Sequence, residues 1–382
     1  MKSFLVSAFS IAGLVLVAGA AQADDVRVIV GFKGDASASV VTAHGGRVHG
    51  ASGGWVSASV APGQIAKLRA SAEVAYVEED SVMETLGREN AGGKPGGGGS
   101  TTPPAQATPW GVDRVDADLA WGSRPTQAGA GIKVMVIDTG VDQDHPDLAA
   151  NTEGGWDFVN GDNNPDDDNG HGSHVAGTIA GVDNTIGVIG VAPGADLYAA
   201  KVLNRRGSGW LSDVAAGIDL ARTSGMHIAN MSLGSSSGAA TLETACNAAA
   251  GAGVLLVAAA GNSGDTNLTD TELGYPAAYD ACVAVGATDS SDQVADFSNS
   301  GAFVDLSAPG VNIPSTFKDG QYKTYSGTSM ASPHVAGMAA LLLELGIPEN
   351  ETLRSQLEAQ VRDLAPGGDD YGYGFGLIDW AP

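Results

Sequence analysis

The chain has 382 residues, which is long enough for a sizeable hydrophobic core and more than one structural unit. Its 19 Lys and Arg side chains are outnumbered by 44 Asp and Glu side chains, so the net charge is −25. Because so negative a surface repels phosphate backbones and anionic lipids, the composition argues against proteins that bind nucleic acids or membrane surfaces.

The first residues have the pattern of a secretory signal peptide. Lys2 is followed by an apolar run to about Gly19, and a small-residue cleavage sequence ends at Ala23. The apolar run is short for a membrane anchor, and no stop-transfer pattern follows it. We therefore expect residues 1–23 to be removed and the mature protein to be secreted, with no membrane attachment afterwards.

Residues 24–86 predict a small α+β unit. Alternating or apolar segments predict strands at 26–30, 55–60 and 75–77, and residues 64–70 predict a helix. Residues 87–105 are rich in Gly, Ser, Thr and Pro, which is typical of a flexible linker.

Residues 106–382 predict an α/β domain with a mostly parallel central sheet that is flanked by helices on both faces. Near-continuous apolar segments alternate there with small-residue helices, as expected when strands are buried on both sides. Strands are expected at 133–137, 196–203, 227–233, 254–259 and 282–286, and helices at 174–181, 211–224, 241–250 and 330–345. In such sheets, functional groups gather beyond the carboxyl ends of the strands.

Four polar residues stand where this architecture places its chemistry. Asp138 ends an apolar strand, His171 lies between glycines before a helix, and Asn262 follows another buried strand. Ser329 precedes a helix whose first turn is expected to contain Pro333. A serine needs a base to take its proton, the base needs a carboxylate to fix its tautomer, and an amide can donate to an oxyanion. Asp138, His171, Ser329 and Asn262 therefore form a complete set for acyl transfer.

The segments around these residues resemble the signature blocks of the subtilisin-like serine peptidases. The similarity runs from about Gln106 to residues 373–379, and residues 26–86 resemble the inhibitory propeptide of that family. The four matching blocks are 138–140, 171–174, 260–262 and 327–331. The resemblance implies an endopeptidase with Asp138, His171 and Ser329 as its catalytic triad.

The sequence lacks the signature motifs of other hydrolase classes. A zinc peptidase needs a His-Glu-x-x-His motif, which is absent from the sequence, and an α/β-hydrolase places its nucleophilic serine first in the chain. An inactive binding module on the same fold is the remaining alternative, but such a module would not need all four positions filled.

The resemblance also implies how a peptide substrate binds. The peptide is expected to add as a strand between two edges, with large uncharged side chains preferred before the cleaved bond. The residues implied are Ser208, Gly209, Ser232, Leu233, Gly234, Ala260 and Gly261. We expect a broad-specificity monomer that acts on proteins and peptides.

Two structural, non-catalytic Ca²⁺ sites are implied by the same resemblance. For site 1 the ligands are Gln106, Asp147, Val182, Asn184, Ile186 and Val188. For site 2 they are Asp157, Asn160, Asp162, Asn164 and Asp166. Oxygen-only sets of this size suit Ca²⁺. Acidic loops are often solvated without binding an ion, so the alternative for site 2 is a surface loop that binds no Ca²⁺.

The resemblance further predicts self-processing. It places the first cleavage after Leu86, with the propeptide remaining bound as an intramolecular inhibitor and the linker then trimmed toward Gln106. Cys246 and Cys282 form either one disulfide or two buried thiols, and export favours the disulfide.

Overall fold

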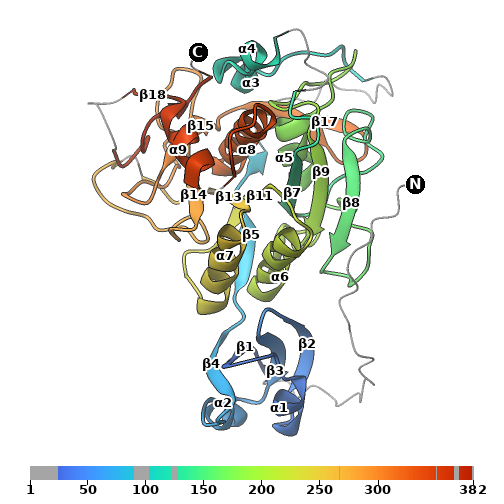
Figure 1. The fold of residues 1–382 in the computed structure, drawn as a ribbon, viewed down its shortest axis with the longest axis vertical. Coiled ribbons are helices and arrows are strands. Elements are labelled where there is room, and N and C mark those ends of the chain that lie inside the picture. Colours follow the sequence, from blue (N-terminus) through green and yellow to red (C-terminus); the bar gives the residue numbers. More distant parts are fainter. Residues whose placement is uncertain are drawn as a thin grey trace.

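A computed structural model describes residues 25–89, 103–122, 128–265, 267–349, 351–364 and 370–380. The expected signal peptide, residues 1–23, lies outside these residues, as does most of the expected linker. The described chain forms two units, a small N-terminal one and a larger one that contains the remaining elements (Figure 1).

The small unit is a four-stranded antiparallel sheet in the order β2-β3-β1-β4, with two helices packed on it. Its core is formed by apolar side chains such as Val30, Val56 and Leu68. The elements are β1 (Val26–Phe32), α1 (Ala38–Ala43), β2 (Arg47–Ser52), β3 (Trp55–Val60), α2 (Pro62–Arg69) and β4 (Val74–Glu79). The α+β prediction is correct. It missed β2 because this edge strand has no buried residue, so its apolar alternation is weak.

The larger unit is built on a nine-stranded sheet in the order β18-β19-β15-β14-β13-β11-β7-β9-β8. All neighbours pair in parallel except β18 and β19, which confirms the predicted sheet. The strands are β7 (Lys133–Asp138), β8 (Thr152–Asp157), β9 (Asp196–Lys201), β11 (Ile228–Met231), β13 (Leu255–Ala259), β14 (Cys282–Thr288), β15 (Leu306–Pro309), β18 (Val361–Arg362) and β19 (Leu377–Ile378).

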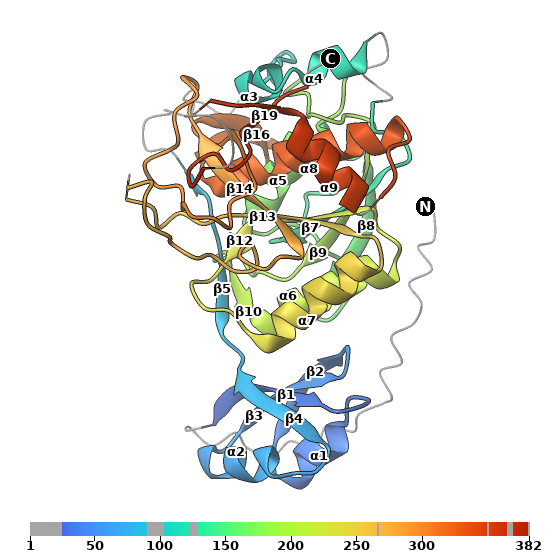
Figure 2. The same ribbon diagram turned by 60° about the vertical axis from the view of Figure 1, so that its left-hand side comes forward.

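Helices cover both faces of this sheet (Figure 2). One hydrophobic cluster joins α5 and α8 to one face, and a second joins α6 and α7 to the other. The helices are α3 (Trp110–Arg114), α4 (Ala117–Trp121), α5 (His171–Ala180), α6 (Leu211–Thr223), α7 (Ala240–Gly251), α8 (Thr328–Glu344) and α9 (Glu351–Ala359). Within the described ranges, no helix has both the length and the apolar character needed to span a bilayer.

Two helices that carry predicted site residues, α5 and α8, begin two or three residues earlier than the sequence predicted. Helix α5 begins at His171 rather than at residue 174, and α8 begins at Thr328 rather than at residue 330. The start of α5 is determined by Asp167, whose carboxylate accepts hydrogen bonds from the backbone N–H groups of Gly170 and Ser173 at 2.8 and 2.9 Å. Such a cap satisfies amide groups that have no partner within the helix.

The early start of α8 places Pro333 in the second turn, which corrects the expectation of a first-turn proline. A proline there has no N–H to donate to the carbonyl of Ser329, four residues earlier. The hydroxyl of Ser232 donates to that carbonyl instead, at 2.9 Å. A side chain that directly follows β11 (Ile228–Met231) therefore supplies the hydrogen bond that the helix cannot make.

Cys246 in α7 and Cys282 in β14 are free, buried thiols in the structure. The disulfide that the sequence slightly favoured is therefore absent. A hydrogen bond with Cys246 and, to a lesser extent, burial raise the pKa of the Cys282 thiol well above its ordinary value. Both side chains belong to the hydrophobic cluster beneath α6 and α7, where they pack as small apolar residues.

The buried His334 of α8 generates a prediction about acid stability. Its Nδ1–H donates to the Met330 carbonyl at 2.8 Å, and burial lowers its pKa to about 4. The unfolded chain takes up a proton below pH 6.5 and the folded chain does not. Stability is therefore lost as the pH falls from 6.5 toward 4, by up to about 1.4 kcal/mol per pH unit from this residue.

We expect His334→Gln, introduced into the Ser329→Ala variant that the sequence predicts to be inactive, to lose less stability on acidification. The measurement is the free energy of unfolding between pH 6.5 and 4.5, compared with Ser329→Ala alone. Equal slopes for the two proteins would show that His334 is protonated in the folded state.

Candidate active site

The carboxyl end of β7 places Asp138 beside the first residue of α5. The Nδ1–H of His171 donates to both carboxylate oxygens of Asp138, at 2.8 and 3.0 Å, and both side chains are buried. Asp138 Oδ1 also accepts the N–H of Thr139 at 2.7 Å. With Nδ1 committed to the carboxylate, the neutral imidazole presents Nε2 as a base.

A second buried carboxylate, that of Asp167, fixes the segments that carry this pair. Its Oδ1 accepts the hydroxyl of Thr139 at 2.9 Å, and its Oδ2 accepts the hydroxyl of Ser173 at 2.7 Å. The same Thr139 oxygen accepts the N–H of Gly172, next to His171, at 2.9 Å. Burial raises the pKa of Asp167, and hydrogen bonds from Ser173, Gly170 and Asn169 oppose that rise. The strand end and the helix start are thus connected through one side chain that the sequence analysis missed.

Ser329, the second residue of α8, lies in the crevice beyond the carboxyl ends of the parallel strands, and its hydroxyl is not hydrogen-bonded to the imidazole. Its Oγ–H donates to the backbone carbonyl of Ser232 at 2.8 Å. His171 Nε2 is buried and has no hydrogen-bond partner among the described residues. The structure therefore brings Asp138 and His171 into direct contact, whereas the Ser329 hydroxyl must rotate to reach Nε2.

Asn262, just after β13, is oriented by Thr328. Its Oδ1 accepts both the N–H and the hydroxyl of Thr328, each at 2.9 Å. This leaves its Nδ2 amide free to donate into the crevice, where it is hydrogen-bonded to the backbone carbonyl of Leu86. Sequence analysis missed Thr328, although a hydroxyl directly before Ser329 in the 327–331 block could have drawn attention to it.

The chain segment that enters the crevice is strand β5 (Val82–Thr85). It pairs antiparallel with β10 (Ser208–Trp210) on one side and with β12 (Leu233–Gly234) on the other (Figure 2). These two edges contain the predicted peptide-binding residues Ser208, Gly209, Leu233 and Gly234. The predicted residues Ala260 and Gly261 follow β13, directly before Asn262.

The peptide bond between Leu86 and Gly87 lies among the polar groups described above. Leu86 N–H donates to the Ser232 carbonyl at 3.3 Å, and its side chain packs on Gly234, where a Cβ would stand 3.0 Å from Leu86 Cδ1. A Cβ on Gly87 would come within 2.7 Å of His171 Nε2. The Leu86 carbonyl is thus held by Asn262, and the next residue lies against the imidazole.

The segment continues as β6 (Arg88–Glu89), which pairs antiparallel with β17 (Gln321–Ser326). Strand β17 in turn forms a hairpin with β16 (Ile313–Phe317). The first residues of the predicted linker, which was expected to begin at Gly87, are therefore structured. The sequence did not predict this, because a two-residue strand is too short to produce a periodic pattern.

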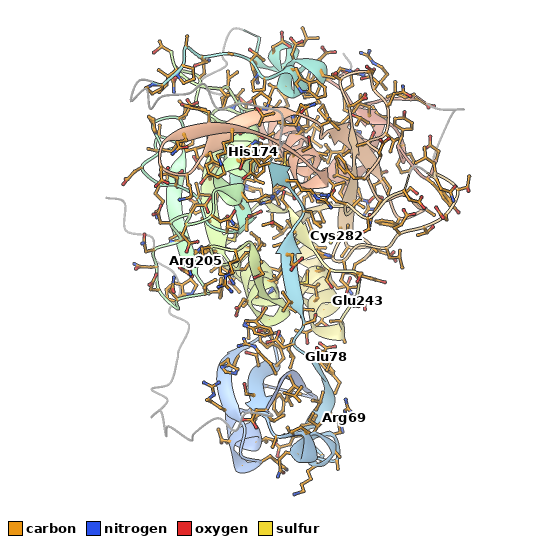
Figure 3. The ribbon with its side chains drawn as sticks, turned by 180° about the vertical axis from the view of Figure 1, so that it is seen from behind. Arg69, Glu78, His174, Arg205, Glu243 and Cys282 are labelled. Atoms are coloured by element: carbon orange, nitrogen blue, oxygen red, sulfur yellow. The ribbon has the colours of Figure 1, made fainter. Side chains whose placement is uncertain are left out.

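Acidic side chains of the small unit bind the amino ends of two helices below the sheet. The Glu78 carboxylate accepts the N–H groups of Ala240 and Thr241 at 2.9 Å each, at the start of α7 (Figure 3). Asp80 accepts the N–H and the hydroxyl of Ser212, at 2.9 Å each, at the start of α6. These positions favour carboxylates because helix amino ends carry unpaired N–H groups and partial positive charge.

The predicted residues of Ca²⁺ site 1 come together. Asp147 is buried and accepts Asn184 Nδ2 at 2.7 Å and Val188 N–H at 2.8 Å, while Gln106 Oε1 accepts Asn184 N–H at 2.5 Å. Burial raises the pKa of Asp147. Within the described chain, the carbonyl oxygens of three predicted ligands accept no hydrogen bond: Val182, Ile186 and Val188. A buried carboxylate with neutral donors, beside free carbonyl oxygens, fits a bound cation.

The predicted residues of site 2 lie on one loop but are bonded to one another. The Asp157 carboxylate accepts the N–H and the Nδ2 amide of Asn160, at 2.9 and 2.7 Å. Asp162 Oδ1 accepts the N–H of Asn164 at 2.9 Å, and burial raises the pKa of Asp166. Asn160 thus occupies the Asp157 oxygens that the prediction assigned to a cation.

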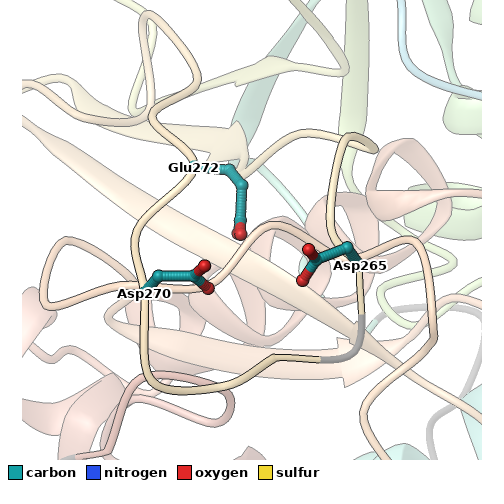
Figure 4. Close-up of side chains that lie close together, drawn as sticks. All are labelled: Asp265, Asp270 and Glu272. Carbon is teal, nitrogen blue, oxygen red and sulfur yellow. The ribbon is translucent and has the colours of Figure 1, made fainter.

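A further acidic group lies in the loop after Asn262. Carboxylate oxygens of Asp265, Asp270 and Glu272 lie within 4.8 Å of one another (Figure 4). Asp265 and Asp270 are exposed, and Glu272 already accepts Ser300 N–H at 3.0 Å. We assign no ligand to this group, because exposed carboxylates often gather without one.

Comparison with known proteins points to one family. A family model described as the subtilase family matches residues 129–376. The chain is 44% identical over 325 residues to the M-protease of Shouchella clausii, covering 85% of this chain and 77% of the relative. It is 49% identical over 276 residues to subtilisin Savinase of Lederbergia lenta, covering 72% and 98%. It is 41% identical over 365 residues to subtilisin E of Bacillus subtilis, covering 92% and 89%.

Proposed function

The chain belongs to the subtilase family and is a subtilisin-like serine endopeptidase, and we propose that it is secreted as a self-processing precursor with Asp138, His171 and Ser329 as its triad. The observation that carries the proposal is the placement of the Leu86 carbonyl on Asn262, with Gly87 beside His171. A peptide bond of the chain itself thus lies where a substrate bond would react.

The proposed reaction begins when the Ser329 hydroxyl leaves the Ser232 carbonyl and turns to His171 Nε2. His171 takes the proton while the Ser329 oxygen attacks the Leu86 carbonyl carbon, and Asp138 stabilises the resulting imidazolium. Asn262 Nδ2 and the backbone N–H of Ser329, at the start of α8, stabilise the negative charge on the carbonyl oxygen. His171 then donates its proton to the Gly87 nitrogen as the bond breaks. Water hydrolyses the acyl-enzyme in the same way.

Substrate preference follows from the surroundings of Leu86. Its side chain contacts Gly234 of β12, and we expect residues 260–261, which follow β13, to border the same space. The residues expected to surround the side chain are uncharged, so we propose a preference for large uncharged side chains before the cleaved bond. A charged side chain there would lose its hydration without gaining a partner.

Residues 24–86 are proposed to act as the intramolecular inhibitor. Strand β5 occupies both edges that a peptide substrate would use, and Glu78 and Asp80 hold the small unit on α7 and α6. These contacts do not depend on the Leu86–Gly87 bond. The small unit can therefore remain bound after the first cut until it is digested.

Calcium is proposed as a structural ion at site 1, where Asp147, Asn184, Gln106 and the free carbonyls would supply oxygen ligands. Gln106 contacts Asp183 and Asn184, in the site 1 loop, while the peptide bond between Leu86 and Gly87 is still intact. Residues 87–105 connect Leu86, which contacts Asn262, to Gln106, which contacts the site 1 loop. An extended chain spans about 3.3–3.6 Å per residue, so a connection of this length has a long reach. We therefore infer that site 1 can assemble before the first cut.

The first prediction from the proposed function concerns catalysis. Ser329→Ala and His171→Ala should each leave a folded precursor of full length, because the triad acts as a unit. In mature enzyme, Asn262→Leu should lower kcat by about 10²–10³ with little change in KM, as for loss of such a donor within this family. The measurements are precursor mass and steady-state hydrolysis of an uncharged peptide. Normal maturation of either triad variant would contradict the assignment.

The second prediction concerns maturation. Leu86→Asp should slow the first cut, because it places an unpaired charge in an apolar space, whereas Leu86→Phe should mature at nearly the parent rate. N-terminal sequencing over time measures both rates. If no early cut occurs near Leu86, or if Leu86→Asp matures normally, the processing site is wrong while the triad assignment remains.

The third prediction concerns calcium. In the uncleaved Ser329→Ala precursor, added Ca²⁺ should raise the melting temperature, because an ion bound only to the folded state adds RT ln(1 + [Ca²⁺]/Kd). Asp147→Asn should remove most of that increase, and the exposed Asp35→Asn in the small unit should not. Site 1 would be refuted if the melting temperature does not change on adding calcium, on adding a chelator, or in Asp147→Asn.

A further inference from the structure

We propose that Lys323 makes this peptidase favour substrates with an acidic side chain at the third residue after the cleaved bond. The proposal rests on the proposed function, because residues are counted from the Leu86–Gly87 bond. On that count Gly87 is first, Arg88 second and Glu89 third. The proposal names a specificity determinant on the side of the crevice that follows the cleaved bond.

The backbone of β17 aligns the peptide on this side. Ser326 pairs with Arg88, and Tyr325 pairs with Glu89, in an antiparallel register. Backbone pairing of this kind accepts many sequences, so selectivity must come from side chains along the strand. Lys323 lies two residues before Tyr325 and therefore projects from the same face of β17.

The side chain of Lys323 reaches the third residue directly. Its Nζ lies 3.1 Å from Glu89 Oε2, within the range of a charge-assisted hydrogen bond. The Lys323 side chain is 27% exposed and that of Glu89 is 53% exposed. A substrate carboxylate at this position could form the same contact without becoming buried.

The lysine is held in place by an aromatic ring as well as by its acidic partner. Its Nζ lies 4.2 Å from the centre of the Phe317 ring, on the neighbouring strand β16, which is a cation–π contact. Phe317 is itself buried and packs against Tyr325, with 5.8 Å between ring centres. After residue 89 leaves, the ring can keep the ammonium group over the same site.

The neighbouring lysine of this hairpin is differently engaged. Lys318 Nζ lies 2.9 Å from Asp319 at the turn between β16 and β17. The charge of Lys318 is therefore already paired with its neighbour Asp319. Substituting Lys318 controls for a general effect of removing a positive charge from this hairpin. Because the pair formed by Lys323 is partly exposed, the expected preference is modest, about 1.5- to 5-fold for a carboxylate over a neutral side chain.

The test uses mature enzyme and internally quenched peptides that are identical except for Glu, Gln or Lys at the third residue after the cleaved bond. Mass spectrometry of the products verifies the cleaved bond. In the parent enzyme we expect kcat/KM to fall in the order Glu, Gln, Lys, and added salt to reduce the differences. Lys323→Met should bring the Glu-to-Gln ratio near one, Lys323→Glu should invert it, and Lys318→Met should keep the parent ratio.

Two failures can be distinguished. If the Gln peptide is cleaved at the expected bond but the Glu-to-Gln ratio is unchanged in Lys323→Met and Lys323→Glu, the role of Lys323 is refuted and the proposed function stands. If none of the peptides is cleaved at that bond, the proposed function fails, and the inference about Lys323 fails with it.

Discussion

The hydrogen bond between Asp138 and His171 is the interaction on which the proposed chemistry depends. It buries a carboxylate completely, which is unfavourable unless donors surround the charge. His171 Nδ1 and Thr139 N–H supply those donors, and Asp167 ties the two segments together through Thr139. Nearby, the buried Lys201 donates to the Thr139 carbonyl at 2.6 Å. The orientation of one imidazole is therefore determined by side chains from a strand end, a loop and a helix start.

The parallel sheet explains why these groups meet at one place. Asp138 ends β7, Asn262 follows β13, and α8 begins with Thr328 and Ser329 beside them. Both faces of the parallel sheet are covered, so its accessible backbone groups lie at the strand ends. Strands β10 and β12 are outside that sheet, and their edges pair with β5 in a separate three-stranded sheet. A peptide that pairs with these edges delivers a carbonyl to Asn262 and the following residue to His171. In the structure this peptide is the chain's own segment 82–89, which also pairs with β17.

Much of this arrangement could be predicted from the sequence, because its signals are local. The apolar strands, the residues at their carboxyl ends and the four blocks around Asp138, His171, Asn262 and Ser329 are all short motifs. What could not be predicted depends on contacts between distant segments. The Ser329 hydroxyl bonds to the Ser232 carbonyl, and β6 pairs with β17 over only two residues. Neither contact leaves a periodic pattern, and the cysteine spacing could not distinguish a disulfide from the two buried thiols observed.

The most direct test of the triad is covalent labelling of the mature enzyme with a fluorophosphonate, followed by peptide mass spectrometry. We expect an adduct on Ser329 alone, with parallel loss of peptidase activity. Labelling should be strongly slowed in His171→Ala, because the serine then lacks its base. An adduct on a different serine that abolishes activity, or full activity after complete labelling of Ser329, would contradict the assignment.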